Sequence, residues 1–250
     1  IISVLIVIKL LIKKFKIPTR MAYLISIGST VCGTTAIMAT APVIKASKNE
    51  VSYAIANITL FGILSMLIYP YFANFYFDSK PLLAGLFLGT SIHETSQVAA
   101  AGLIYEQQFN SPETLNIATV TKLIRNTFLI VMIPLFAFLY NRGQARERNY
   151  SILNIIPYFV LGFVGMIIFR NLGDQIFIYD NQFNWSETIN IIKFLSKIFL
   201  TMAMAAIGLS TNLKDIKNMG YKPFLVGFIA MLTVGIVCIL TIESYLKFFI

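Results

Sequence analysis

The sequence predicts an all-α fold, a polytopic bundle of membrane-spanning helices, from its composition and from the placement of its charges. Hydrophobic residues make up 57% of the 250 residues and charged residues only 12%, whereas soluble domains carry about 25% charged residues. The net charge of +9 comes from basic residues that gather in short clusters between apolar runs. Such clusters set the topology of membrane proteins, so we expect a lipid bilayer as partner and no nucleic acid.

Apolar runs of spanning length predict a single transmembrane domain over residues 1–250, because a bilayer core requires roughly 20 apolar residues per helix. They comprise a partial span at 1–12 and about seven full spans, near 23–45, 51–72, 81–105, 114–140, 152–170, 188–211 and 222–245. The chain opens inside an apolar run, IISVLIVIKLLIKKFKIP. We therefore expect an N-terminally truncated fragment.

Three loops rich in lysine and arginine orient these spans. By the count of spans, the loops at 13–20, 142–148 and 214–222 all fall on one side of the membrane, which the positive-inside rule makes the cytoplasmic side. Acidic residues such as Glu106 and Asp174 fall on the opposite side. The C-terminus is therefore expected outside the cytoplasm.

Two of the expected spans contain glycines and hydroxyl side chains that interrupt the helical pattern. The run SIGSTVCGTTAIMATAP in span 23–45 should be unwound in its middle, and MAMAAIGLSTNL ends span 188–211 with a second segment of this kind. These spans are five apart in the count, and an odd spacing inverts the second copy, which predicts inverted five-helix repeats with two crossed broken helices. The candidate substrate- or ion-binding residues are Gly28, Ser29, Thr30, Gly33, Thr34, Thr35, Gly208, Ser210 and Thr211.

Broken helices suit ion binding because each half-helix has polar ends. Its N-terminus presents unpaired N–H groups and a partial positive charge, and its C-terminus presents carbonyl groups. One crossing can therefore hold an anion and a cation side by side. The structural alternative is that the small residues and hydroxyls only allow helices to pack closely.

The run GTSIHETSQVAAAG places ionisable side chains in the middle of an apolar span. Charged groups at bilayer depth are costly and normally face an ion or substrate path, so His93 and Glu94 are candidates for coupling or gating. On a continuous helix, His93 would align with Gln97 four residues later. Lys122 and Arg125, three residues apart on the next span, would neutralise Glu94 or attract an anion. The alternative is a structural polar cluster that joins two helices.

Three segments carry a family resemblance: GSTVCGTTAIMATAPVIKA at 28–46, GTSIHETSQVAAAG at 89–102 and MAAIGLSTNL at 204–213. In this order they resemble the YeiH-like family of bacterial inner-membrane proteins, which are named as sulfate exporters, and the resemblance covers nearly the whole chain. It implies a fold similar to the sodium/proton antiporter and bile-acid symporter superfamily, with two crossed broken helices. It also implies the bacterial inner membrane as the location and sulfate or a sulfonate as the substrate.

The expected function is secondary active transport of a small anion that binds where the broken helices cross. The chain has no G-x-x-x-x-G-K-[ST] run to hold ATP phosphates, so a gradient has to supply the energy, with sodium or a proton as the coupling ion. A cation antiporter of the same superfamily is one alternative, although the carboxylate pair usual at its crossing is missing from both segments. A passive channel is another.

An enzyme, an organic cofactor and a metal centre are not expected. HETSQ lacks the second histidine of the H-E-x-x-H zinc motif, and nothing supplies an oxyanion hole to a serine or threonine nucleophile near His93. The sequence leaves the oligomeric state open, with a homodimer as one option.

Overall fold

The computed structural model describes residues 2–15, 17–129, 131–133, 135–136, 158–177, 184–210 and 221–249, and the regular elements in these ranges are all helices. The chain divides into two compact units. Residues 1–147 and 213–250 form the first, and residues 148–212 form the second. The expected all-α class is confirmed for the part of the chain that the structure describes.

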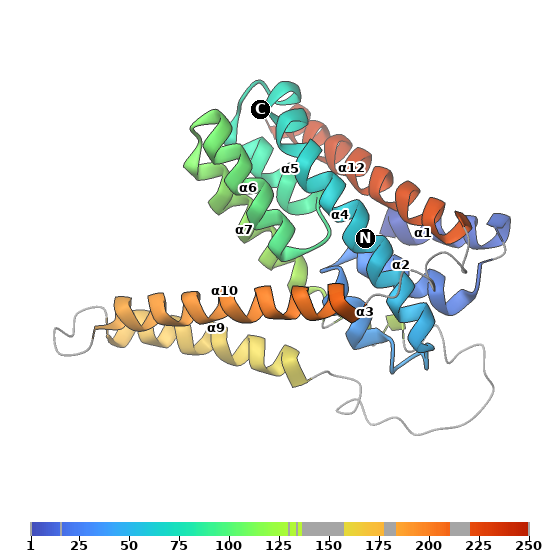
Figure 1. The fold of residues 1–250 in the computed structure, drawn as a ribbon. Helices are drawn as coiled ribbons and strands as arrows, with labels where there is room; N and C mark the ends of the chain where they lie inside the picture. The colour runs from blue at the N-terminus through green and yellow to red at the C-terminus, as the bar shows by residue number, and fades with distance from the viewer. Residues whose placement is uncertain are drawn as a thin grey trace. The chain divides into compact units, whose positions relative to one another are not determined.

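The helices lie in the apolar runs expected from the sequence, but the runs at 23–45 and 81–105 are each divided into two helices (Figure 1). The first unit contains α1 (Ile2–Phe15), α2 (Thr19–Thr30), α3 (Thr34–Thr40), α4 (Lys48–Tyr76), α5 (Pro81–Ser91), α6 (Thr95–Phe109), α7 (Pro112–Thr127) and α12 (Tyr221–Phe249). The second contains α9 (Tyr158–Ile176) and α10 (Trp185–Ser210). By length and composition, α4 and α12 are able to cross a membrane.

Local sequence signals set several helix starts. The Ser47 hydroxyl accepts a hydrogen bond from the Glu50 N–H at 3.3 Å, and the Glu50 carboxylate accepts one from the Ser47 N–H at 2.8 Å. This capping box starts α4. Pro81 and Pro112 start α5 and α7, at a helix position where the N–H would have no intrahelical partner.

Helices α2 and α3 form a hairpin whose tip is residues 31–33. Gly33 has a φ of +67°, a conformation open mainly to glycine, so the expected unwinding in the middle of this run is confirmed. The chain reverses direction at the tip. Ile37 of α3 lies beside Gly28 of α2, where an added Cβ atom would be 2.9 Å from Ile37 Cδ1. A helix that continued straight would separate these two residues by about 13 Å. The run expected as span 23–45 therefore folds into a hairpin of two short helices.

Helix α5 runs alongside α7 in the same direction. A Cβ atom on Gly85 would lie 2.7 Å from the Ile117 side chain, and one on Gly89 would lie 2.7 Å from Thr121 Cβ. Both glycines therefore allow the two helices to approach closely. The helix stops at Ser91, where the backbone becomes extended.

Helix α6 runs back along α7, so α5 and α6 form a second hairpin with its tip at residues 92–94. The Asn126 amide donates to the Thr95 hydroxyl at 3.1 Å, and a Cβ atom on Gly102 would lie 2.7 Å from Leu115. The two helices have 11 and 15 residues, or about 16 and 22 Å, against a hydrocarbon core of roughly 30 Å. The run expected as span 81–105 therefore also turns back, which the sequence did not predict.

The two hairpins enter from opposite ends of α4. The first ends at Thr40 and leads directly into the start of α4. The second begins at Pro81, directly after the end of α4, and returns there, since the Tyr105 hydroxyl donates to Asn74 Oδ1 at 3.1 Å. The hairpin tips therefore approach each other between the ends of the long helix.

Helix α12 lies parallel to α4 and completes the first unit. Near its start the Pro223 carbonyl accepts a hydrogen bond from Asn57 Nδ2 at 3.0 Å, and near its end Glu243 accepts one from the Tyr76 hydroxyl. A buried hydrophobic cluster joins α12 to the second hairpin and α7, and it includes Phe87, Leu88, Val98, Ala101, Ala118 and Cys238.

In the second unit, α9 and α10 pack along each other. The Trp185 indole donates to Asp174 Oδ1 at 2.6 Å, and its ring lies 5.5 Å from that of Phe169. A Cβ atom on Gly173 would lie 2.0 Å from the Trp185 ring, so glycine is required for this contact. Arg170 forms an ion pair with Asp174 at 2.8 Å.

Candidate functional site

The tips of the two hairpins meet at Gly33 and Glu94. A Cβ atom on Gly33 would lie 2.4 Å from Glu94 Cγ, so only glycine allows this approach. The Glu94 Oε1 atom accepts a hydrogen bond from the Thr34 N–H at 3.3 Å, and Glu94 is 3% exposed. The second hairpin thus supplies an acceptor to the start of α3, where backbone N–H groups have no partner within the helix.

Lys122 on α7 joins both tips from the side. Its ammonium donates to the carbonyl oxygens of Val31 and Ile92, each at 2.9 Å, and to that of His93. The side chain is fully buried. Because an ammonium has three donors and no acceptor, these carbonyls use its whole hydrogen-bonding capacity.

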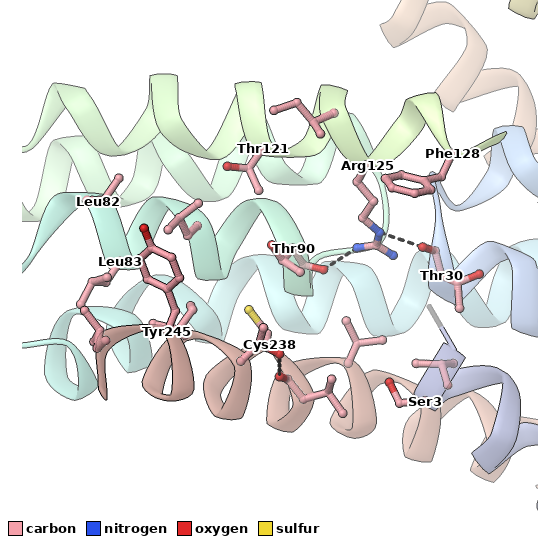
Figure 2. A pocket seen from close by; sticks show the side chains of 18 residues that line it. Ser3, Thr30, Leu82, Leu83, Thr90, Thr121, Arg125, Phe128, Cys238 and Tyr245 are labelled. Atoms are coloured by element: carbon pink, nitrogen blue, oxygen red, sulfur yellow. Dashed lines mark hydrogen bonds between the residues drawn. The ribbon is translucent and has the colours of Figure 1, made fainter. Parts of the chain in front are cut away.

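Arg125, almost one turn further along α7, binds the ends of α2 and α5 (Figure 2). Its Nε donates to the Thr30 carbonyl at 2.9 Å, and one terminal nitrogen donates to the Ser29 carbonyl at 2.5 Å. The other terminal nitrogen donates to the Thr90 carbonyl. The guanidinium therefore caps the C-termini of two helices from different hairpins.

The charges at the tips match the helix ends that they contact. Lys122 and Arg125 lie at the C-terminal ends of α2 and α5, which carry partial negative charge, and Glu94 lies at the N-terminal ends of α3 and α6, which carry partial positive charge. The sequence-based expectation paired the two basic residues with Glu94 or with a substrate anion. The structure instead directs their donors to backbone carbonyls, which the interrupted helices leave without partners.

Several buried polar atoms at the tips have no hydrogen-bond partner. They are both ring nitrogens of His93, Glu94 Oε2, Gln97 Oε1 and the hydroxyls of Ser29, Thr34 and Thr59. His93 is fully buried, and Gln97 and Thr34 are 4% and 5% exposed. Buried polar atoms in native proteins are almost always paired with protein or water, so this group is a candidate place for a proton, an ion or a polar ligand.

The structure corrects the expected alignment of His93 with Gln97. His93 lies in the non-helical tip before α6, so the spacing of a continuous helix does not apply to it. The Gln97 amide instead donates to the Thr59 carbonyl on α4 at 3.2 Å. A Cβ atom on Gly62 would lie 2.0 Å from Gln97 Oε1, so glycine makes room for this side chain. Sequence reasoning missed Thr59, because a hydroxyl in an apolar helix is a common, unspecific feature.

The other expected site residues differ in their surroundings. Gly28 packs against Ile37, which agrees with the close-packing alternative, and the Thr35 side chain is exposed. Gly208 and Ser210 lie in α10, which is continuous through Ser210, and Thr211 lies outside the described residues. The crossing between the two expected broken segments therefore stays a prediction.

A cavity of about 740 Å³ adjoins the tips. Its walls come from α1, α5, α7 and α12 and are mostly apolar (Figure 2). Thr30 and Arg125 lie at one end, Leu82 and Tyr245 at the other, and Thr90 lies between them. The described residues contain no group of three or more His, Cys, Asp or Glu able to hold a metal ion.

Sequence comparison places the chain in a family of membrane proteins. Residues 1–227 match the family model of conserved hypothetical protein 698. The chain is also 37% identical over 243 residues to a UPF0324 membrane protein of Fusobacterium nucleatum, covering 94% of this chain and 69% of the relative. The chain belongs to the UPF0324 family.

Two other UPF0324 membrane proteins are similar to most of this chain. A membrane protein of Streptococcus agalactiae is 38% identical over 247 residues, which cover 97% of this chain and 70% of the relative. One from Haemophilus influenzae is 33% identical over 227 residues, or 88% of this chain and 62% of the relative. No solved structure matches the chain. The membrane assignment drawn from composition is therefore supported by relatives that are named as membrane proteins.

Proposed function

We propose that this UPF0324 protein is a secondary active transporter of a small anion, with its binding site at the hairpin tips. The observation that carries the proposal is the meeting of two re-entrant hairpins from opposite ends of α4 at Thr34 and Glu94. Non-helical backbone at membrane depth occurs where it is buried in protein or lines a cavity. Tips reached from both sides suit alternating access, because each hairpin separates the site from one side of the membrane.

The charge at the tips supports an anion as the substrate. Two buried or half-buried cations, Lys122 and Arg125, accompany the single carboxylate of Glu94. The first turn of α6 also begins here, and its N–H groups have no intrahelical partner. Sulfate or a sulfonate is proposed through the resemblance to the YeiH-like family. In this proposal the segment from Gly208 to Thr211 contributes to the same site.

A cation antiporter is the second candidate function. The unpartnered atoms Glu94 Oε2, Gln97 Oε1 and the Thr34 hydroxyl are all oxygens, the ligands that hard cations prefer. Sodium or a proton would then be transported or would drive the anion. A passive channel also fits a site of this kind and differs by lacking saturable exchange.

The remaining proposals concern the setting of the protein. We place it in the bacterial inner membrane with the C-terminus outside the cytoplasm, as a monomer or homodimer, without an organic cofactor. Its action is transport and not catalysis.

Counterflow of radiolabelled sulfate in proteoliposomes tests the function. We expect saturable exchange by the full chain, and at least an approximately tenfold loss in Thr34→Val, which removes a buried hydroxyl at the tips. Thr35→Val is the matched control, because the neighbouring Thr35 is exposed, and it should retain exchange.

Measurements with and without sodium identify the coupling ion. Sodium-dependent exchange without any anion specificity would favour the cation antiporter. Flux that neither saturates nor exchanges would indicate a channel. Normal exchange by Thr34→Val would remove the hairpin tips as the binding site.

A further inference from the structure

Glu94 occupies the position at which an anion would bind to α6. It is the N-cap residue of this 15-residue helix, yet its side chain makes no capping hydrogen bond there. The carboxylate instead accepts a hydrogen bond from the Thr34 N–H in the other hairpin. Its second oxygen, Oε2, is buried without a partner among the protein hydrogen bonds, and Lys122 and Thr59 lie beside the carboxylate.

The charged groups around Glu94 are all cationic or neutral. Lys122 faces it from α7, and His93 adjoins it in the same tip. Arg125 faces His93 and Lys122, and Cys32 of the first tip faces Lys122. An anion that enters here therefore meets one negative charge, that of Glu94, and close like charges in a buried site repel strongly.

The neutral groups around Glu94 include acceptors for a protonated carboxyl group. Thr59 on α4 lies beside the carboxylate, and a hydroxyl can accept a hydrogen bond from a carboxyl group as well as donate one to a carboxylate. Gln97 Oε1, one turn along α6, is an acceptor without a donor. A protonated carboxyl group has an O–H donor that a carboxylate lacks.

We propose that a proton and the substrate anion bind together, with the proton on Glu94 and the anion at the start of α6, whose N–H groups the Glu94 side chain leaves uncapped. This inference rests on the proposed function. The proton neutralises Glu94, and the anion replaces its charge beside Lys122, so one proton and one monoanion leave the net charge of the site unchanged. A proton gradient then drives anion movement through this one carboxyl group.

Protonation of His93 or binding of a sodium ion would compensate the charge of the anion less well than protonation of Glu94. A proton on His93 would add a third positive charge beside Lys122 and Arg125 and would leave the Glu94 carboxylate in place. A sodium ion at the same oxygens would lie against Lys122 and the positive end of α6. Protonation of Glu94 has neither drawback.

Binding of methanesulfonate, a monoanion, and of sulfate to the purified full chain tests the inference. Calorimetry in two buffers of different ionisation enthalpy counts the protons taken up with each anion. We expect about one proton per methanesulfonate in the wild type, and an affinity that falls about tenfold per pH unit above the Glu94 titration.

Glu94→Gln, which mimics the protonated residue, should bind methanesulfonate without proton uptake and without pH dependence. The matched control is Glu113→Gln, since Glu113 is an exposed carboxylate in the first turn of α7. This variant should behave as the wild type. His93→Gln should also keep the proton uptake.

Anion binding without proton uptake by the wild type would overturn the inference and leave the proposed function standing. Proton uptake that persists in Glu94→Gln, or that disappears in His93→Gln, would likewise overturn it. Failure of both anions to bind the wild type and Glu94→Gln at every pH would overturn the proposed anion function together with the inference.

Discussion

Lys122 shows how a single side chain can make interrupted helices stable inside a membrane protein. Its three hydrogen bonds go to the Val31, Ile92 and His93 carbonyls. A buried polar group without a partner costs about 1–3 kcal/mol. Without this ammonium, the three carbonyl oxygens at the two tips would lose the hydrogen-bond donor that it provides. The sequence marks Lys122 as a partner of Glu94 or as an anion ligand, whereas in the structure its three donors link the two hairpins.

Lys122→Met should lower the free energy of unfolding by about 3 kcal/mol, because it leaves the three carbonyls buried without donors. Thermal unfolding in detergent measures the change. Lys193→Met, at an exposed lysine of α10, is the control and should unfold with the wild type. An equal melting temperature for Lys122→Met would contradict the structural role.

The pair of helices α9 and α10 depends on a contact between one carboxylate and one indole. The hydrogen bond from Trp185 and the neighbouring Arg170 guanidinium hold the pKa of Asp174 below its ordinary value. Because the folded-state pKa is lowered, this contribution to stability is fully present above the ordinary aspartate pKa. It is lost as the pH falls through the folded-state pKa.

Trp185 is the only tryptophan of the chain, so its fluorescence reports this contact directly. We expect a fluorescence transition on acidification with its midpoint below the ordinary pKa of an aspartate. Asp174→Asn should remove the transition. Glu187→Gln, at an exposed carboxylate in the first turn of α10, should leave it unchanged. A transition that survives in Asp174→Asn would have another origin.

Two hairpins in place of two full spans would leave the expected side of the basic clusters unchanged. Each hairpin would return the chain to the side it came from, and two such returns cancel in the count of crossings. The loops at 13–20, 142–148 and 214–222 would therefore keep their expected cytoplasmic side. Lys45, Lys48 and Glu50 would join that side, and Asp78 and Lys80 would move to the outer side, so the cytoplasmic side would gain one basic residue in balance.

Cysteine labelling in cells distinguishes hairpins from spans. With hairpins, Lys48→Cys faces the cytoplasm and Lys80→Cys faces outward, and with two full spans these sides are exchanged. Phe248→Cys, 84% exposed near the C-terminus, should face outward in either case and serves as the reference. A membrane-impermeant maleimide applied to intact and permeabilised cells measures the side. The native Cys32 and Cys238 are buried and are replaced by alanine to remove background.

Labelling of Lys48→Cys in intact cells, with Lys80→Cys protected, would contradict the hairpin arrangement. Protection of Phe248→Cys would contradict the expected position of the C-terminus. Both results are independent of any transported substrate.

The helical membrane class, the apolar runs and the first interruption could be predicted from the sequence alone. Composition and hydrophobic length are properties of the chain alone, and Gly33 carries a local signal because its backbone conformation is open mainly to glycine. The ionisable side chains of His93, Glu94, Lys122 and Arg125 were also recognisable, because charge is rare at bilayer depth.

That both interrupted runs turn back and that their tips meet depends on contacts between residues far apart in the chain. The tip at 92–94 contains no glycine or proline, and its carbonyls are satisfied by Lys122, which lies 30 residues away from Ile92 in the chain. The same holds for Glu94, whose partner at Thr34 is 60 residues away. Such long-range donors and acceptors make an interruption stable, and no local pattern in the sequence records them.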